Sequence, residues 1–170
     1  MRLFIAVNPA PELALRLDRL TGQLRAASSR GVFVGRENLH LTLVFLGETA
    51  QVRDAEKALD NLSCEPFEIE VCGTGRFKRS GVVWGGVIHS ESLMQLQQAV
   101  FKNAQNAGFE LENRTYHPHI TLVREARVKG DYRLPEVRRN WMAIGRVCLM
   151  KSERQDGKLV YTEVKGVKLL

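Results

Sequence analysis

Residues 38–46 read Asn-Leu-His-Leu-Thr-Leu-Val-Phe-Leu, and residues 116–124 read Tyr-His-Pro-His-Ile-Thr-Leu-Val-Arg. Each stretch holds a histidine, an aliphatic residue, a threonine and then Leu-Val. Side chains of a β-strand alternate between its faces, so a histidine and a threonine two positions apart share a face, roughly 6.5–7 Å from each other. The aliphatic residues between them take the other face and can pack on a core. The repeated pattern predicts two strands, each with an apolar face and a His-Thr pair on the open face.

Strict alternation also places the residue that follows each Leu-Val pair. It puts Phe45 on the face that packs, so we expect Phe45 in the core, with stacking near a base as the open alternative. It puts Arg124 on the face opposite His119, so this arginine reaches the same site only if the strand ends or twists there. His117 lies two positions before His119, but Pro118 cannot donate a ladder hydrogen bond and makes a regular strand doubtful. We expect His117 to support His119 or its loop.

Two histidines that face one another suit acid–base chemistry. Imidazole has an ordinary pKa near 6.5, so one ring can accept a proton while the other donates one. Threonine hydroxyls and a guanidinium can hydrogen-bond phosphate oxygens as negative charge grows on them. The sequence therefore offers a candidate site for phosphoester chemistry, with catalytic histidines and substrate-binding partners: His40, His119, Thr42, Thr121 and Arg124.

Two other interpretations remain open. His117 and His119 form a His-x-His pair of the kind that binds zinc, but no acidic or cysteine partner stands at a convincing spacing. An RNA-binding module without catalysis would explain a basic chain, yet it leaves the two His-Thr pairs unexplained. We expect no metal and no cofactor.

The composition limits the class of protein to which the chain can belong. The 170 residues include 44% hydrophobic and 26% charged residues, which is typical of a globular chain of one compact unit or two small lobes. No apolar run approaches the roughly 20 residues that span a bilayer, and residues 2–7 are too short for a signal peptide. We expect a cytoplasmic protein that binds no membrane. The three cysteines lack C-x-x-C spacing and predict reduced thiols: Cys64, Cys72 and Cys148.

The chain is basic, with 25 Lys and Arg against 19 Asp and Glu and a net charge of +6. Such a balance favours polyanionic partners, although many basic proteins bind no nucleic acid. The positive residues cluster at Arg76, Lys78 and Arg79, at Arg124, Arg127, Lys129 and Arg133, and at Arg138 and Arg139. We expect Lys78, Arg79, Arg127 and Lys129 to help longer RNA bind without taking part in chemistry.

Hydrophobic periodicity predicts the elements along the chain. Strands are expected at 2–8, 38–46, 67–77, 82–88, 118–124, 141–152 and 159–164, and helices at about 12–25, 51–62 and 92–107. Residues 26–29 are expected to close the first helix, residues 78–81 to form a hairpin turn and Gly108 to stop the third helix. Helices mix with mostly antiparallel strands without strict β-α-β alternation, which predicts an α+β fold.

At these residues the chain resembles the 2H phosphoesterases, specifically the LigT-like RNA 2′,3′-cyclic phosphodiesterases once called 2′-5′ RNA ligases. The shared features are two H-x-T-x motifs at 40–43 and 119–122 and their flanks: Asn38-Leu39, Phe45-Leu46-Gly47-Glu48, His117-Pro118 and Arg124, with similar stretches at 2–7 and 82–84. The resemblance implies one domain over 1–170. It also implies a bilobal, pseudo-twofold fold whose intertwined lobes each supply one motif strand to a central cleft, with helices outside.

The resemblance also implies an activity. It implies metal-independent hydrolysis of RNA 2′,3′-cyclic phosphate ends to 2′-phosphomonoesters, with His40 as the acid, His119 as the base and Arg124 near the phosphate. RNA ends or small cyclic nucleotides would be the substrates of a monomer. The reverse reaction, which joins RNA ends through a 2′-5′ bond, stays open; the sequence has no P-loop, which argues against an ATP-driven form.

Overall fold

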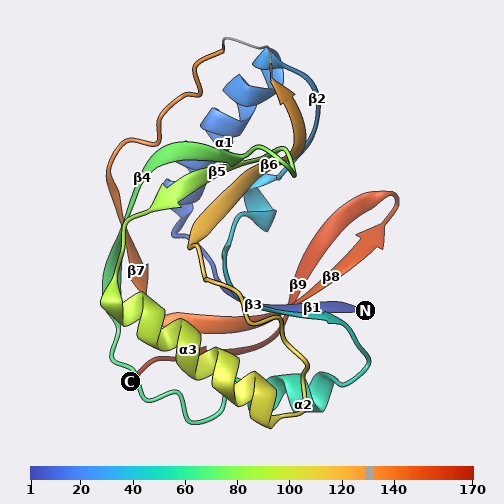
Figure 1. Cartoon of the computed structure of the whole chain (residues 1–170), viewed down its shortest axis with the longest axis vertical. Helices are drawn as coiled ribbons and strands as arrows, with labels where there is room; N and C mark the ends of the chain where they lie inside the picture. The colour runs from blue at the N-terminus through green and yellow to red at the C-terminus, as the bar shows by residue number, and fades with distance from the viewer. Residues whose placement is uncertain (129–131) are drawn as a thin grey trace.

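The computed structural model describes residues 1–128 and 132–170 (Figure 1). The strands are β1 (Arg2–Val7), β2 (Ser28–Phe33), β3 (Leu41–Glu48), β4 (Phe67–Phe77), β5 (Val82–Val87), β6 (His119–Val128), β7 (Asn140–Ile144), β8 (Arg146–Gln155) and β9 (Lys158–Lys168). The helices are α1 (Pro11–Ala27), α2 (Val52–Lys57) and α3 (Glu91–Asn106), with a 3₁₀ turn η1 at Arg36–Asn38. The predicted α+β class is confirmed.

All strands belong to one sheet in the order β7-β4-β5-β6-β3-β1-β8-β9, with β2 paired to β6. The order divides into two halves that meet where the motif strands β6 and β3 lie side by side. In the described residues the two strands pair in register at Leu41 and Ile120, and each of these residues directly follows a motif histidine. The whole sheet therefore folds around the contact between the two repeated sequences.

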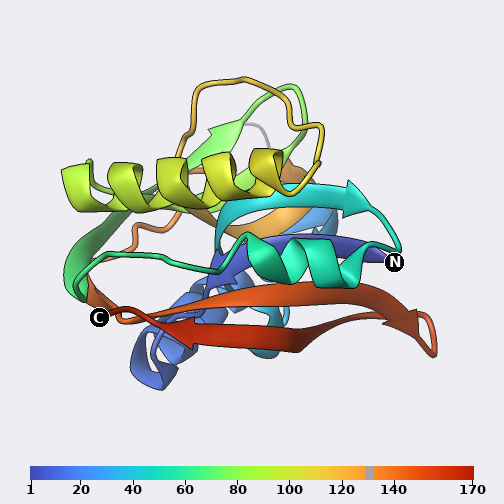
Figure 2. The ribbon, with the colours of Figure 1, turned by 90° about the horizontal axis from the view of Figure 1, so that it is seen from below.

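The helices connect the two halves. The helix α1 follows β1 but packs on β6 of the other half, and α3 follows β5 but packs on β3. They cover opposite sides of the sheet (Figures 1 and 2). On α3, Gln97 is buried and its side-chain amide donates to the carbonyl of Leu43 at 3.4 Å. Each motif strand is thus supported by a helix from the opposite half.

Local sequence explains most element boundaries. The helix α1 has proline in its first turn and buries Leu13, Leu17 and Leu24 along one stripe. The helix α3 begins where the Ser90 hydroxyl accepts a hydrogen bond from a first-turn amide, and it ends before Gly108, whose φ is +95°. The turn at 78–81 between β4 and β5 is also as predicted.

Two predicted elements differ from the structure. Residues 141–152 do not form one strand: β7 pairs with β4 and β8 pairs with β1, at distant positions in the sheet, and Gly145 separates them. Alternating hydrophobicity cannot reveal that a strand changes partner halfway. The helix α1 ends at Ala27 with Ser28 as its C-cap, inside the stretch predicted to close it, and Ser28 also begins β2, which pairs with β6. The helix α2 is shorter than the predicted 51–62 and ends at Lys57.

Further expectations can be compared with the described residues. Cys64, Cys72 and Cys148 are free thiols, as predicted. Within residues 1–128 and 132–170, no helix is long and apolar enough to cross a membrane. Lys129, which is expected to help longer RNA bind, lies outside the described residues.

Candidate active site

The four motif side chains come together because Leu41 and Ile120 pair in antiparallel register. That register places His40 beside Thr121 and His119 beside Thr42. Leu41 and Ile120 are themselves fully buried on the core side. The sheet therefore carries a diagonal arrangement in which each histidine has the other motif's threonine as its cross-strand neighbour.

Both histidine rings are held in the same way. The Nδ1 atom of His40 lies 2.7 Å from the carbonyl oxygen of Asn38, and that of His119 lies 2.7 Å from the carbonyl oxygen of His117. A carbonyl only accepts, so Nδ1 must carry the hydrogen and donate it. When the ring is neutral, Nε2 then carries the lone pair. This tautomer presents both Nε2 atoms as proton acceptors or, once protonated, as donors.

Aromatic rings surround each histidine. Phe4 lies 4.8 Å from the His40 ring centre and Tyr161 stands edge-on to it at 5.2 Å. Phe77 stands edge-on to the His119 ring at 5.1 Å, and Trp84 lies 6.3 Å away. A Cβ at Gly75 would collide with the Trp84 ring, so glycine is needed on β4 to let this indole lie against the sheet.

The two histidines differ in exposure and in proton affinity. His40 is 6% exposed, whereas His119 is only partly buried. Burial lowers the pKa of His40 to about 4, and the positive charge of Arg124 lowers it further against the opposing effect of the Asn38 carbonyl. Burial also lowers the pKa of His119, and Arg124 acts in the same direction there. Both rings are therefore neutral at neutral pH in the free protein.

A β-bulge in each motif strand overturns the prediction from strict alternation. The pairing of β3 with β1 skips Leu43, and the pairing of β6 with β5 skips Leu122. In both strands the Leu-Val pair is buried at two successive positions, so the next side chain changes face. Phe45 is therefore 53% exposed and not in the core. Arg124 joins the face of His119 for the same reason.

Arg124 brings a positive charge to this face without a carboxylate to neutralise it. Among the described residues, no Asp or Glu oxygen lies within 4.0 Å of its guanidinium. Its one side-chain hydrogen bond there goes from Nη2 to the Tyr161 hydroxyl at 3.4 Å. A partly buried guanidinium with free donors suits a phosphate.

Sequence reasoning missed two residues on the His40 side. The Asn38 side chain accepts from the Tyr161 amide at 3.2 Å and donates to the Leu159 carbonyl at 2.9 Å. Because the Asn38 carbonyl also holds His40, one residue connects the histidine to β9. The position of Asn38 two residues before His40 was a signal for this role, but nothing local marked Tyr161, which is 121 positions away from His40 in the sequence.

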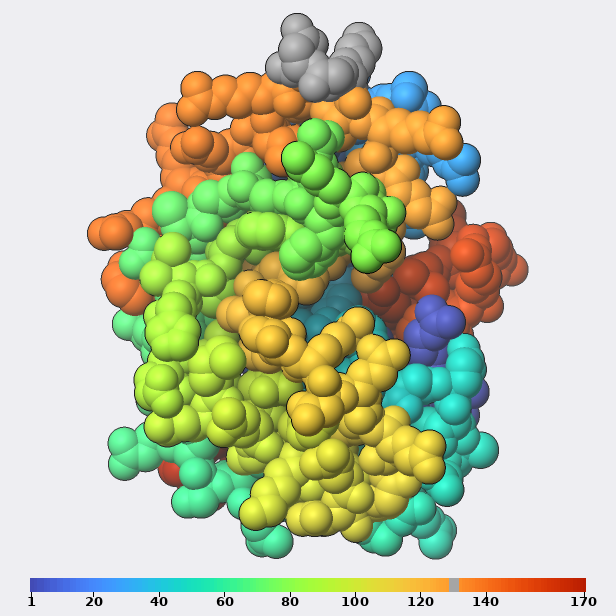
Figure 3. Space-filling model, in the orientation of Figure 1, coloured from blue at the N-terminus to red at the C-terminus, as the bar shows by residue number. Residues whose placement is uncertain are grey.

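A groove leads away from the site on the His119 side. Its volume is about 560 Å³, and Thr42, Phe45, Phe77 and His119 belong to its lining. Residues 110–112 and 114–117 also line it, together with Phe101 of α3. In Figure 3 the blue-green surface of β3 lies recessed between the green β4–β5 hairpin and the yellow segment before β6. His40, Thr121 and Arg124 are not among the lining residues, so the groove opens from one side of the site only.

The remaining histidines lie outside this arrangement. The His117 side chain is exposed and acts on His119 through its backbone carbonyl, in line with its expected supporting role. His89 is exposed and 3.7 Å from Glu91. Within residues 1–128 and 132–170, no three His, Cys, Asp or Glu side chains gather as a metal site. The zinc interpretation of His117 and His119 thus has no third ligand in that part of the chain.

The predicted basic residues fall into two groups. Lys78 and Arg79 are exposed at the β4–β5 turn, and the Gly81 carbonyl of that turn accepts from the Ala126 amide on β6, next to exposed Arg127. These cations therefore gather at one end of the sheet. Two others are paired with carboxylates instead: Arg133 with Glu136 and Arg139 with Glu70.

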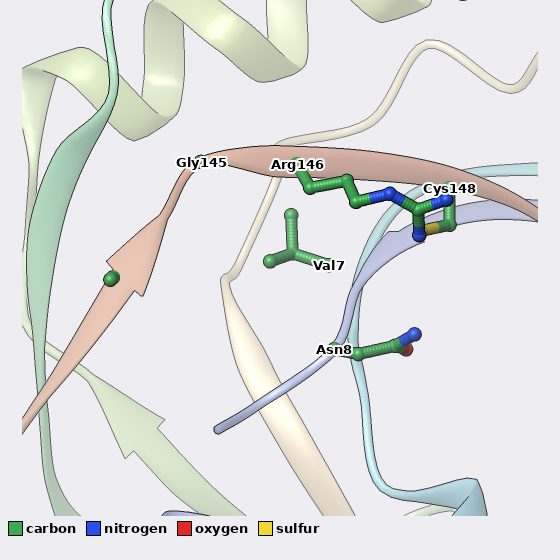
Figure 4. Close-up of a pocket in the computed structure, with 6 residues that line it drawn as sticks. Val7, Asn8, Gly145, Arg146 and Cys148 are labelled. Atoms are coloured by element: carbon green, nitrogen blue, oxygen red, sulfur yellow. The ribbon is translucent and has the colours of Figure 1, made fainter. Parts of the chain in front are cut away.

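A second hollow of about 220 Å³ lies where β7 meets β8 (Figure 4). Val7, Asn8, Gly145, Arg146 and Cys148 are among its lining residues. The Arg146 guanidinium lies 3.0 Å from the Cys148 sulfur and forms an ion pair with Glu163. Its charge is already matched, and no histidine lines the hollow, so we place the chemistry at the motif strands.

Comparison with known proteins places the chain in a family. Residues 9–156 match the model of the 2′-5′ RNA ligase superfamily. The RNA 2′,3′-cyclic phosphodiesterase of Methanothermobacter thermautotrophicus is 32% identical over 186 residues, covering 99% of both chains. That of Escherichia coli is 36% identical over 170 residues, covering 96% of this chain and 94% of its own. The crystal structure of E. coli LigT complexed with 3′-AMP superposes with a TM-score of 0.87 at 29% identity, covering 99% of this chain and 97% of that one.

Proposed function

The chain belongs to the 2′-5′ RNA ligase superfamily, and on that premise we propose that it hydrolyses RNA 2′,3′-cyclic phosphate ends to 2′-phosphomonoesters. One observation carries the proposal. Two histidines with identically fixed tautomers stand at the contact of two sheet halves, beside two threonines and an arginine without a carboxylate partner in the described residues. That set supplies a base, an acid and donors for a phosphate.

The proposed reaction needs one proton removed and one proton supplied. The water oxygen attacks phosphorus while Nε2 of neutral His119 takes the water's proton. The bond between phosphorus and the ribose 3′-oxygen breaks, and Nε2 of protonated His40 gives its proton to that oxygen. Solvent then returns both rings to their starting states, so one water is consumed for each phosphate opened.

The low proton affinity of His40 makes its protonation part of substrate binding. Burial and the charge of Arg124 keep His40 neutral in the free protein at neutral pH. A bound phosphate carries negative charge, which offsets Arg124 and attracts a proton to the nearby ring. Thr42, Thr121 and Arg124 donate to the non-bridging oxygens as charge grows on them. In this scheme they do the work that a metal ion does in other phosphoesterases.

The experiment is to incubate the protein with a short RNA that ends in a 2′,3′-cyclic phosphate and to identify the product by phosphorus NMR. The expected product is a 2′-phosphate. His89→Ala is the control, because His89 is an exposed histidine outside the site. A 3′-phosphate product would reverse the leaving group, and an unchanged cyclic phosphate would overturn the proposal.

The name of the matched superfamily favours one second candidate, the joining of RNA ends through a 2′-5′ bond. In that reaction a ribose 5′-hydroxyl takes the place of water and the same two histidines exchange the same protons. Adding an RNA with a free 5′-hydroxyl to the incubation tests it. A product longer than either RNA, sensitive to the same histidine substitutions, is the expected sign of joining.

A further inference from the structure

The two motif strands have the same bulge but different neighbours beside it. On β6 the skipped residue is Leu122, and its carbonyl accepts a hydrogen bond from the Val34 amide at 2.9 Å, just past the end of β2. On β3 the skipped residue is Leu43, and the pairing with β6 ends at Leu41 in the described residues, which leaves β1 as its neighbour there. Backbone carbonyls beside such a bulge need partners from outside the sheet.

Two side chains supply those partners along β3. The Leu43 carbonyl accepts from the Gln97 side-chain amide at 3.4 Å, and the Thr42 carbonyl accepts from the Tyr116 hydroxyl at 2.8 Å. Gln97 lies on α3, and Tyr116 lies in the segment that leads from α3 to β6 (Figures 1 and 3). The bulge of the first motif is therefore held by side chains at the place where the bulge of the second motif is held by a backbone amide.

These two hydrogen bonds are shielded from water. Gln97 is 9% exposed, and Tyr116 is partly buried. Burial raises the pKa of Tyr116, so its hydroxyl keeps its hydrogen and donates well above neutral pH. An apolar side chain would fill either position, but it would leave a carbonyl of the motif strand without this donor. The two polar groups are thus specific to holding β3.

Tyr116 also connects the first motif to the second. The next residue, His117, holds the His119 ring through its backbone carbonyl at 2.7 Å. The register of the two motif strands makes His119 the cross-strand neighbour of Thr42. Two successive residues therefore fix one group of each motif, and the Tyr116 hydrogen bond sets where Thr42 lies relative to the histidine beside it.

We propose that Gln97 and Tyr116 are positioning residues that hold the first motif strand so that the Thr42 hydroxyl faces the reacting phosphate. The inference rests on the proposed function, in which Thr42 donates to a non-bridging oxygen. Each of the two side chains acts through a carbonyl of β3 and not on the phosphate itself. Because the donation from Thr42 strengthens as charge grows in the transition state, a misplaced hydroxyl should lower kcat and change KM little.

Kinetics of conservative variants test the proposal. Tyr116→Phe and Gln97→Met remove the donors and keep most of the side-chain volume. We expect Tyr116→Phe to lower kcat on a cyclic-phosphate RNA about fivefold and Gln97→Met, whose bond is longer, about threefold, each with KM within about twofold. In a Thr42→Val background both losses should vanish, because the hydroxyl that they position is absent. The matched control is Asn103→Leu, which should keep full kcat. It removes another α3 amide, one that donates to two carbonyls just after α2.

The NMR signal of the Thr42 methyl group gives a second measurement that needs no turnover. Thr42→Val identifies the signal by its loss, and the same spectra show that each variant is folded. We expect Tyr116→Phe and Gln97→Met to move the signal and Asn103→Leu to leave it in place. A signal that moves in a protein that opens no cyclic phosphate supports the positioning of Thr42, and the proposed function alone then fails.

Three results would overturn the positioning role. The first is a Thr42 signal that stays in place in both Tyr116→Phe and Gln97→Met. The second is a signal that moves while kcat is unchanged, because the position of Thr42 then has no effect on the reaction. The third is a loss of kcat that persists in the Thr42→Val background. In that case the two side chains act directly in the groove that they line.

Discussion

The two motif strands share a sequence pattern, a bulge and a way of fixing a histidine, yet they lie in different surroundings. In the first, the histidine is 6% exposed and Phe45 follows the bulge; in the second, the histidine is more accessible and Arg124 follows it. The shared features place two imidazoles alike. The differences place the two imidazoles in unequally buried surroundings and give the site a cationic side and an aromatic side. Repetition therefore accounts for the shared geometry, and the separate roles that we propose would follow from the differences.

The largest expected effect comes from removing either imidazole. We expect His40→Ala and His119→Ala each to lower kcat by about 10³–10⁴-fold, the upper part of the range for one acid–base role, because the phosphate also loses a partner. His89→Ala should keep full activity. Single-turnover rates on a cyclic-phosphate RNA measure this. Near-wild-type activity in either motif variant would contradict this prediction, because it would show that the imidazole of that motif takes no part in catalysis.

A sulfur leaving group separates the two roles that the resemblance assigns. A substrate with a 3′-thio group needs little help from an acid, because a thiolate leaves readily. With it, His40→Ala should recover much of its activity and His119→Ala should not. Rescue of His119→Ala instead would mean that His40, the more buried histidine, is the base. Its pKa of about 4 in the free protein suits a base, because the ring is then neutral at neutral pH.

Arg124 and Phe45 occupy corresponding positions in the two motif strands but differ in chemistry. We therefore expect their substitutions to change kcat by different amounts. We expect Arg124→Met to lower kcat by about 10²–10³-fold, because it removes charge-assisted donors from the transition state. Phe45→Met should leave kcat within about threefold, because Phe45 lines the groove beside the site and offers neither charge nor a hydrogen-bond donor to the phosphate. Arg127→Met, an exposed arginine further along β6, is the control. An Arg124→Met effect confined to KM would place this guanidinium outside the chemical step.

Unequal burial of the histidines should appear in the stability of the protein against pH. The pKa of His40 is lowered from 6.5 to about 4 on folding, so the unfolded chain binds more protons between these values. Stability is fully present above pH 6.5 and is lost as pH falls towards 4, by about 3 kcal/mol for this group. Urea unfolding at several pH values measures it. The slope should flatten in His40→Asn and much less in His119→Asn; equal slopes would show that the two surroundings do not differ energetically.

The sequence predicted the parts of the site that depend on local pattern. The repeat at 40–44 and 119–123 indicated two strands with paired histidines and threonines, and the structure places these strands side by side. The bulges at Leu43 and Leu122 lay beyond such reasoning, because a bulge depends on how a partner strand pairs and not on the residues of one strand alone. Phe45 was therefore assigned to the wrong face. Alternation alone also placed Arg124 on the face opposite His119, and the bulge brings it to the same face.

Contacts between residues far apart in the sequence were the other features that the sequence could not predict. The change of partner at Gly145 takes the chain from β7 to β8 and so from one half of the sheet to the other, although 141–152 reads as one apolar strand. Tyr161 reaches the site only because β9 lies beside Asn38, a contact over 123 positions. No window of single-sequence pattern contains both partners of such a contact. Its residues become visible only once the halves of the sheet are assembled.

Tyr161 gives the smallest expected effect and tests whether the two halves of the site act together. Its hydroxyl accepts from Arg124 of one motif strand, while its ring covers His40 of the other. Tyr161→Phe removes only the hydroxyl, and at 3.4 Å that bond is long, so we expect kcat/KM to fall about fivefold, roughly 1 kcal/mol. Tyr161→Leu also removes the ring. It should open His40 to water, raise its pKa towards 6.5 and shift to higher pH the limb of the pH–rate profile that His40 sets, whereas Tyr161→Phe should leave that limb in place.

A double-mutant cycle shows whether the hydroxyl works through the arginine. If Tyr161 positions Arg124, then Tyr161→Phe should cost nothing further in the Arg124→Met background, because the group that it holds is already gone. An undiminished fivefold loss in that background would mean that the hydroxyl acts on its own, most directly by donating its hydrogen to a phosphate oxygen. In the described residues that hydroxyl appears only as an acceptor, so its hydrogen is available for this. The cycle therefore decides whether the polar half of the site is one positioned guanidinium or a guanidinium and a phenol side by side.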